Sequence, residues 1–213
     1  VDGNIDAAAG AITNTGTLTA AGDVNNTSGV TLGTSGGLTL DGGSPQTVEA
    51  TIDGVNDTYG SITVNSGNDA TFNSVIGGNQ TVGAFNVTSG ATTLAADAFF
   101  SGNVDVAGGE ILTNNANLTV GGDVTNTGTI TNDGTLTLNG ANNAATVNNN
   151  GTLTIGQALT NTGAIDLSAT AMGDTTVDIS ALEGGETAIT GGVSSTGNTE
   201  VVVNPVLADE SEV

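Results

Sequence analysis

The stretch Leu112-Thr113-Asn114-Asn115-Ala116-Asn117-Leu118-Thr119-Val120 returns further along the chain as Ile130-Thr131-Asn132-Asp133-Gly134-Thr135-Leu136-Thr137-Leu138. The following match places Leu153 after Leu136 at nearly the same interval. Two such steps relate residues 118–128 to residues 153–163, and a similar pattern begins at Leu18. The period is about 18 residues, and self-similarity at a fixed period is the signature of a repeat architecture.

The smallest recurring unit within this repeat is a short strand that reads apolar, polar, apolar. Eight copies begin at Leu38, Ile62, Phe85, Val104, Leu118, Leu136, Leu153 and Ile165. Alternation with a period of two is typical of half-buried β-strands, whereas no apolar period of 3.6 residues is sustained. The chain is therefore predicted to be all-β.

The length of the repeat has a direct physical meaning. Three strands of about four residues, each followed by a short corner, complete one coil of about 18 residues in a parallel β-solenoid, and successive coils stack about 4.8 Å apart. Apolar residues at alternate positions then point into a narrow core, which suits Val, Ile and Leu. A β-sandwich is the main alternative fold, but it does not explain the self-match.

The corners are predicted at Asn-Thr-Gly, Asn-Asp-Gly and Asn-Asn-Gly, which occupy residues 126–128, 132–134 and 149–151. Gly and Asn tolerate positive φ angles there at little cost. Asn residues at equivalent corners of successive coils can also form ladders of side-chain amides. The corner composition therefore predicts both a backbone conformation and a stacking interaction.

The spacing divides the chain into regions. Residues 11–169 are predicted to form the solenoid, residues 1–10 an N-terminal strand or cap, and residues 170–213 a non-repeat segment that caps the stack or joins subunits. Between residues 44 and 110 the spacing widens, as the long interval from Leu38 to Ile62 shows, so longer coils are expected there. All four Phe residues and the single Tyr fall in this wider part.

The charge composition excludes several classes of binding partner. The chain has 22 acidic residues and no Lys, Arg or His, so its formal charge is −22. No phosphate-binding patch can form without cations, so nucleic acid and anionic membranes are not expected partners. The absence of Cys excludes a disulfide framework and thiolate metal sites. We expect an extracellular or cell-surface protein from which a signal or pro-segment has been removed.

The repeats resemble the β-strand-repeat passenger and fibre regions of bacterial surface proteins, such as autotransporter and filamentous-haemagglutinin-like proteins. The resemblance covers about residues 10–170. It is carried by Gly-Thr-Leu-Thr at 16–19, 134–137 and 151–154, by the Asn-Thr-Gly corners and by Ser61-Ile62-Thr63-Val64-Asn65-Ser66-Gly67. It implies secretion, surface display and a role in adhesion, matrix or fibre formation.

No catalytic or cofactor-binding residues are predicted, and the chain is not expected to be an enzyme. Lyase chemistry on a β-helix needs a base and a cation, and glycoside hydrolysis needs two acids facing one cleft. The one cofactor considered is calcium, with Asp23 and Asp123 as ligands, because both follow a Gly-Gly or Ala-Gly pair in matching repeats. The third match is Ala158, and solvent-facing corner carboxylates are the simpler interpretation.

Outward Thr-x-Thr pairs suggest an ice-binding surface as a further hypothesis. They occur at 17/19, 125/127, 129/131, 135/137, 152/154 and 160/162. Thr is also a good β-former wherever a strand faces solvent. Irregular spacing argues against one flat array.

The ends of the stack are the remaining candidate site, because a solenoid exposes unpaired strand edges at its first and last coils. Assembly candidates are Ile5, Glu200, Val201, Val202, Val203 and Pro205. The predicted function is that of a self-assembling subunit of an extracellular fibre, filament or matrix, joined head to tail. Its main partner would be another copy of the chain. The alternatives are an adhesin fragment that binds a cell-surface glycan or protein, and an ice-binding solenoid.

Overall fold

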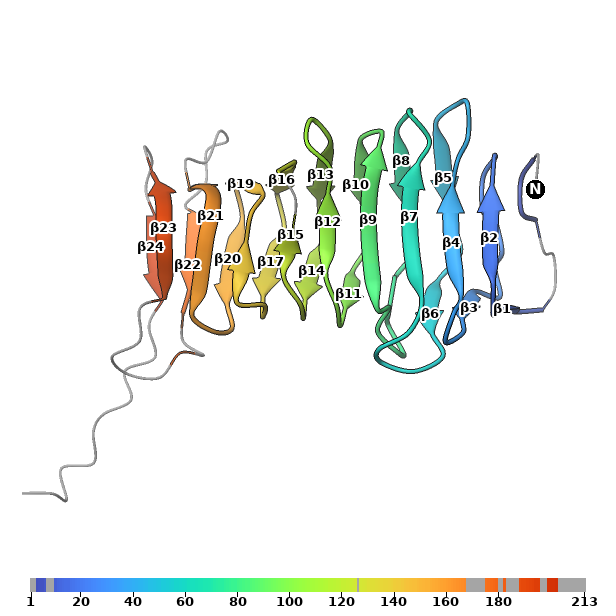
Figure 1. Cartoon of the computed structure of the whole chain (residues 1–213), viewed down its shortest axis with the longest axis horizontal. Helices are drawn as coiled ribbons and strands as arrows, with labels where there is room; N and C mark the ends of the chain where they lie inside the picture. Colours follow the sequence, from blue (N-terminus) through green and yellow to red (C-terminus); the bar gives the residue numbers. More distant parts are fainter. Residues whose placement is uncertain are drawn as a thin grey trace, which may run out of the picture.

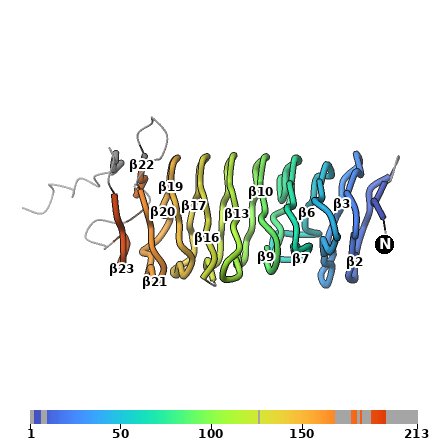
Figure 2. The backbone as a smooth tube through the Cα atoms, turned by 90° about the horizontal axis from the view of Figure 1, so that it is seen from above, coloured from blue at the N-terminus to red at the C-terminus, as the bar shows by residue number. Residues whose placement is uncertain are grey.

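The protein is a parallel β-solenoid of about eight turns, with coils of about 20 residues between residues 12 and 178. The computed structural model describes residues 3–6, 10–125, 127–167, 175–179, 182, 188–195 and 199–202. Figures 1 and 2 show the coils stacked side by side along one long axis. The predicted fold class is confirmed, and the β-sandwich alternative is wrong because the described strands pair in parallel. The described residues form no helix with the length and apolar character of a membrane span.

Each coil contributes a strand to three stacked faces. Face 1 contains β2 (Thr17–Ala20), β4 (Gly37–Leu40), β7 (Ser61–Asn65), β9 (Ala84–Ser89), β12 (Val104–Val106), β15 (Val124–Thr125), β18 (Asn142–Asn143) and the first half of β21 (Leu159–Asp166). Face 2 contains β5 (Gln46–Val48), β8 (Ala70–Phe72), β10 (Thr92–Leu94), β13 (Ile111–Asn114), β16 (Thr129–Asn132), β19 (Thr146–Asn149) and the second half of β21.

Face 3 contains β1 (Ile12–Asn14), β3 (Val30–Leu32), β6 (Ile52–Gly54), β11 (Ala98–Phe100), β14 (Asn117–Val120), β17 (Thr135–Leu138), β20 (Thr152–Ile155), β22 (Thr175–Asp178) and β24 (Thr199–Val202). Single bridges at Ile76 connect β6 to β11. Strand β23 (Ile189–Ser194) pairs along both halves of β21. The three faces therefore run nearly the whole length of the described stack.

Alternation within each strand builds the core. Most strands show the pattern buried, half-buried, buried, as in β12, where Val104 and Val106 point inward and Asp105 points outward. The core is a single apolar column because equivalent residues, such as Leu118, Leu136 and Leu153, stack in register. A period-two sequence pattern thus produces a continuous interior shared by all coils.

The coils are longer in the middle of the N-terminal half, as the spacing predicted. The register places Leu38 opposite Ile62 and Ile62 opposite Phe85, so the wide intervals in the sequence are single coils. Three aromatic rings, one from each face, lie in the core of this part of the stack. Phe72 and Phe85 lie 5.7 Å apart edge to face, and Phe85 and Phe100 lie 4.9 Å apart, measured between ring centroids.

The predicted asparagine ladder is confirmed at the corner between faces 2 and 3. Asn114 donates from Nδ2 to Asn132 Oδ1 at 2.7 Å, and Asn132 donates in turn to Asn149 Oδ1 at 2.6 Å. All three side chains are fully buried. A second ladder step joins Asn143 to Asn161 at 2.6 Å.

The prediction that the corner glycines adopt positive φ angles is wrong at the corners that end at residues 128, 134 and 151. Gly128, Gly134 and Gly151 do not have positive φ angles. A Cβ atom at Gly134 would instead lie 2.0 Å from the carbonyl oxygen of Ala116, in the preceding coil. These glycines are needed because successive coils approach each other too closely for a side chain at the corner.

The described parts of the C-terminal region add strands to the same stack. Val177 of β22 pairs with Leu153, and Val201 of β24 pairs with Val177, so two further coils continue face 3. The predicted boundary at residues 169–170 lies outside the described residues. At the other end, Ile5 forms a single bridge to Val24.

Candidate functional sites

The two calcium candidates occupy different corners, so their predicted equivalence is wrong. Asp23 follows β2 on face 1 and precedes Val24, which pairs with face 2. Asp123 follows β14 on face 3 and precedes β15 on face 1. The matching segments therefore lie a third of a coil out of phase, whereas Leu118 and Leu153 do occupy equivalent positions on face 3.

Each of these carboxylates accepts a main-chain hydrogen bond from the next coil. Asp23 Oδ1 accepts from the N–H of Thr47 at 2.7 Å. Asp123 Oδ1 accepts from the N–H of Asn142, and its Oδ2 accepts from Asn142 Nδ2, both at 3.0 Å. The two side chains thus extend the ladder of inter-coil hydrogen bonds around the corners. Calcium binding by them stays a prediction.

Seven carboxylates along the stack accept a hydrogen bond from the side-chain amide of an Asn in the next coil. The pairs are Asp6 with Asn25, Asp41 with Asn65, Glu49 with Asn73, Asp53 with Asn79, Asp97 with Asn117, Asp123 with Asn142 and Asp133 with Asn150. In every pair the acid precedes the Asn by one coil. In a chain without Lys or Arg, the Asn amide is the neutral donor that pairs with these carboxylates.

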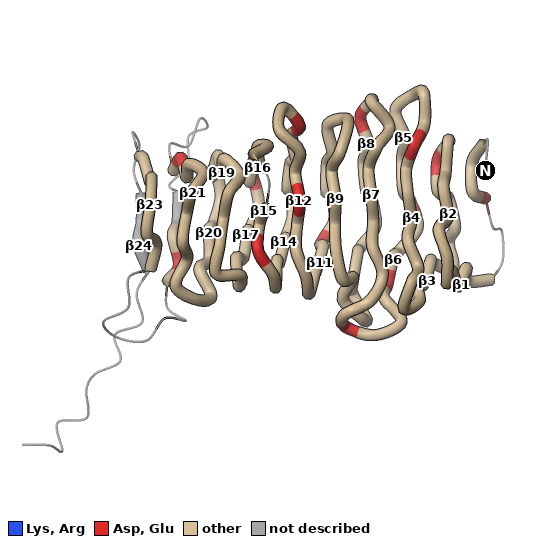
Figure 3. Tube along the Cα trace, in the orientation of Figure 1, with Lys and Arg blue, Asp and Glu red and all other residues tan. Residues whose placement is uncertain are grey.

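The acids belong to coils along the whole described stack. Figure 3 shows them spread along the stack rather than gathered in one patch. No group of three or more His, Cys, Asp or Glu side chains that could hold a metal ion occurs among the described residues. The acid–asparagine pairs were not predicted from the sequence, and the only signal for them there is an Asn that follows the acid by one coil, 17 to 26 residues later.

The first coil exposes the end of the core. Ile12 of β1 and Leu18 of β2 are only partly buried, although they pack against the core. Their partners one coil further on, Val30 and Leu38, are 2% and 0% exposed. Ile5 is buried, and its N–H and C=O both bond to the second coil, so its own main chain does not face outward.

A column of glycines marks the corner between faces 3 and 1. The strand register aligns Gly16, Gly36, Gly60, Gly83, Gly102 and Gly122 in successive coils. A Cβ atom at Gly36 would lie 2.3 Å from the carbonyl oxygen of Asn14, and one at Gly102 would lie 2.0 Å from that of Gly83. Gly16 differs, because nothing lies within 4 Å of its Cβ position. Gly3 is open in the same way, whereas its partner Gly22 is crowded by Asn4.

The last described coil is exposed as well. Val193 of β23 is 44% exposed, and Ile189 is only partly buried. Among the assembly candidates, Glu200, Val201 and Val202 belong to β24, the outermost described strand of face 3. Val203 and Pro205 lie outside the described residues. The described stack therefore presents strand edges and apolar side chains at both ends.

The Thr-x-Thr pairs are divided among the faces. Thr17/Thr19 lie on face 1, Thr129/Thr131 on face 2, and the pairs 135/137 and 152/154 on face 3. The two pairs on face 3 are in register, with Thr135 opposite Thr152 and Thr137 opposite Thr154. Thr119 extends the second column by one coil. A small two-column hydroxyl array therefore exists on this face.

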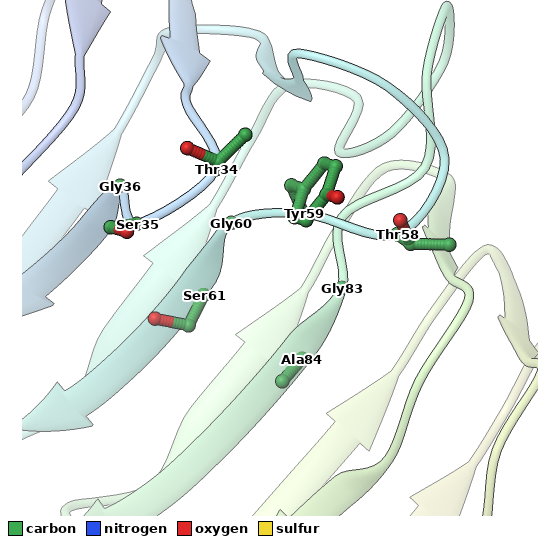
Figure 4. A pocket seen from close by; sticks show the side chains of 9 residues that line it. All are labelled: Thr34, Ser35, Gly36, Thr58, Tyr59, Gly60, Ser61, Gly83 and Ala84. Carbon is green, nitrogen blue, oxygen red and sulfur yellow. The ribbon is translucent and has the colours of Figure 1, made fainter.

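A shallow hollow lies beside the longest corner between faces 3 and 1. Its volume is about 320 Å³, and it is lined by Thr34, Ser35, Gly36, Thr58, Tyr59, Gly60, Ser61, Gly83 and Ala84. Figure 4 shows these residues coming from three neighbouring coils, with Tyr59 on the loop between β6 and β7. Tyr59 is 39% exposed, and none of the lining residues carries a charge.

No protein-family model, no curated protein and no solved structure matches the chain.

Proposed function

We propose that this protein is a non-enzymatic structural subunit that assembles head to tail into an extracellular filament. The last coil of one copy would stack on the first coil of the next, so that the parallel strand pairing continues across the junction. Heterologous contacts of this kind produce open filaments when the rotation between subunits does not close a ring. The function would then be mechanical, as the scaffold of a surface fibre or matrix.

The observation that carries this proposal is the glycine column at the corner between faces 3 and 1. Every other glycine of the column has a neighbour close to its Cβ position in the preceding coil or in its own corner. The first position of this column, residue 16, is also Gly, although no described residue packs against it. A coil from a second copy would supply the missing neighbour. It would also cover Ile12 and Leu18, whose burial favours association.

The acid–asparagine pairs support a polar arrangement of subunits. Each pair places the carboxylate in the earlier coil and the amide in the later one. A junction that continues this pattern has the C-terminal end of one copy against the N-terminal end of the next. A head-to-head junction would bring two ends of the same kind together and would lose the parallel register.

Electron microscopy of negatively stained protein tests the proposal. The wild-type chain should form filaments one solenoid wide, in both the presence and the absence of millimolar calcium. Gly16→Leu should abolish the filaments, because its side chain would occupy the space of the incoming coil. Gly43→Leu is the matched control, since Gly43 is equally open but lies on the side of the stack, between β4 and β5.

Three outcomes decide the matter. Filaments from wild type and from Gly43→Leu, but not from Gly16→Leu, would support end-to-end stacking. Isolated rods of wild-type protein under all conditions would overturn self-assembly as the function. Filaments that persist with Gly16→Leu would rule out this junction.

Ice binding is a second candidate, favoured by the two hydroxyl columns on face 3. Thr135, Thr137, Thr152 and Thr154 form two in-register pairs that face outward. If this array binds ice, the protein should shape growing ice crystals, and replacing Thr137 and Thr154 by Leu should abolish the shaping. Thr125→Leu on face 1 is the control, because Thr125 pairs with Asp105 and not with another Thr. Unshaped crystals with the wild-type protein would exclude this candidate.

A further inference from the structure

The corner between β6 and β7 departs from the regular solenoid. Three residues, 121–123, connect β14 to β15, whereas six residues, 55–60, connect β6 to β7. In Figure 1 this loop projects from the lower edge of the stack. The longer connection places Val55 and Tyr59 on the surface, where they are 47% and 39% exposed.

The loop is held rigidly by the next coil. Asp57 accepts from Thr81 twice, from its N–H at 3.1 Å and from its hydroxyl at 2.8 Å. The carbonyl oxygen of Tyr59 accepts from the N–H of Gly83 at 3.0 Å. Gly60 closes the loop with φ at +87°, and a Cβ atom there would lie 2.6 Å from Cβ of Leu32. The main chain that carries Tyr59 is therefore fixed before any ligand arrives.

The lining of the hollow beside this loop has a particular chemistry. Thr34, Ser35, Thr58 and Ser61 present hydroxyl groups, which both donate and accept hydrogen bonds, and Tyr59 adds an aromatic ring. No charged side chain lines the hollow. Its volume of about 320 Å³ falls at the lower end of the range of small-molecule sites.

This chemistry discriminates between classes of ligand. An anion finds no cation here, and the chain as a whole repels it. An apolar peptide side chain would leave the hydroxyl groups without partners. A pyranose ring fits both features, because its axial C–H face can lie on an aromatic ring while its hydroxyl groups bond at its edge.

We propose that the hollow at Tyr59 is a binding site for one pyranose unit of an uncharged saccharide. Tyr59 provides the stacking platform, and the hydroxyl groups of Thr34, Ser35 and Ser61 bond the sugar edge. The site lies on the side of the stack and does not depend on end-to-end assembly. A filament built from this chain would carry one such site per subunit.

Tyr59 is an intrinsic fluorescence probe of the proposed site. Tyr59 is the single Tyr, and the chain has no Trp, so tyrosine fluorescence reports on this residue alone. We would titrate the protein with glucose, galactose, mannose and N-acetylglucosamine and with their linear oligomers, and measure both fluorescence and heat of binding. At least one of these saccharides should change the fluorescence saturably. Tyr59→Ala should weaken binding about tenfold or more, whereas Tyr59→Phe should weaken it only a few-fold, as measured by heat.

Val55→Ala is the matched control, because Val55 is equally exposed on the same loop but does not line the hollow. It should bind as wild type does. The proposal is overturned if no uncharged saccharide produces a saturable signal, or if Tyr59→Ala binds as well as wild type. A response to oligolysine alone would also overturn it, and would indicate cation attraction by the acidic surface instead. Filament formation is scored separately, so failure of one proposal leaves the other standing.

Discussion

Asn132 shows how one buried polar side chain can fix the register of a solenoid. Its Nδ2 group reaches Asn149 Oδ1 and the carbonyl oxygens of Gly134 and Thr152, while its Oδ1 accepts from Asn114. An aliphatic column alone allows coils to slip, because Leu, Ile and Val are interchangeable neighbours. The ladder penalises any slip by leaving amides unpaired in the core.

Removing the middle of this ladder should therefore destabilise the protein strongly. Asn132→Ala removes the ladder acceptor of Asn114 Nδ2 and the ladder donor to Asn149 Oδ1, and we expect a loss of about 2–4 kcal/mol in the free energy of unfolding. Asn150→Ala removes the exposed hydrogen bond to Asp133 and should cost about 1 kcal/mol or less. Urea denaturation monitored by circular dichroism measures both. Equal losses of stability in the two variants would show that the buried ladder contributes no more than an exposed pair does.

The acidic side chains should stabilise corners without the help of a metal. Asp123→Ala removes the acceptor for two hydrogen bonds from Asn142, and we expect a loss of about 1–3 kcal/mol. Asp41→Ala is the control, because its contact with Asn65 is exposed and 3.5 Å long, and stability should change by less than about 0.5 kcal/mol. Denaturation is measured with and without a calcium chelator. A loss at Asp123 that appears only when calcium is present would restore the calcium hypothesis.

At the scale of the element, the same apolar–polar–apolar unit occurs on all three faces. Leu38-Thr39-Leu40 lies on face 1, and Leu136-Thr137-Leu138 lies on face 3. Period-two alternation and corner residues could therefore be predicted from the sequence. The face of each strand could not, because it depends on the number of residues accumulated in all the preceding corners.

That limit explains the errors at the candidate sites. The segment at Leu18 shares Leu-Thr and Gly-Asp-Val with the segment at Leu118, yet their strands belong to faces 1 and 3. The residues of one strand do not indicate to which face the strand belongs. The predicted equivalence of Asp23 and Asp123 is wrong for this reason. The Asn132 ladder was predictable because its period equals the coil length. The hollow at Tyr59 was not, because it depends on a loop whose position is set by contacts with the next coil.

The corner glycines give a test at this scale. Gly16 and Gly134 both begin a Gly-Thr-Leu-Thr strand, but only Gly134 lies against a preceding coil. Gly134→Ala should lower the free energy of unfolding by about 1–3 kcal/mol, because the new methyl group overlaps the Ala116 carbonyl oxygen. Gly16→Ala should leave it unchanged or raise it slightly. Both are measured in dilute, unassembled protein, and an equal loss at Gly16 would contradict the explanation by coil contact.

At the scale of the molecule, a stack of parallel coils has neighbours along one axis only. Contacts are therefore nearly uniform along the length, and a coil in the middle differs from a coil at the end chiefly in having a second neighbour. Ile12 and Leu18 are only partly buried because their coil has one neighbour, since similar strands further along the stack bury their apolar residues fully. Stacking another copy would convert the end coils into middle coils. The opposing force is the charge of −22 on each subunit, with no cation in the chain to offset it.

The balance between these two forces predicts that salt controls assembly. The screening length falls from about 30 Å at 0.01 M salt to about 8 Å at physiological ionic strength, so repulsion between subunits weakens while burial of apolar surface does not. The critical concentration for filament formation, measured by light scattering, should therefore fall as sodium chloride is raised. Potassium chloride should act equally at equal ionic strength, because screening does not depend on the cation. A critical concentration that is independent of salt, or one that responds only to divalent cations, would show that charge repulsion is not the force opposing the junction.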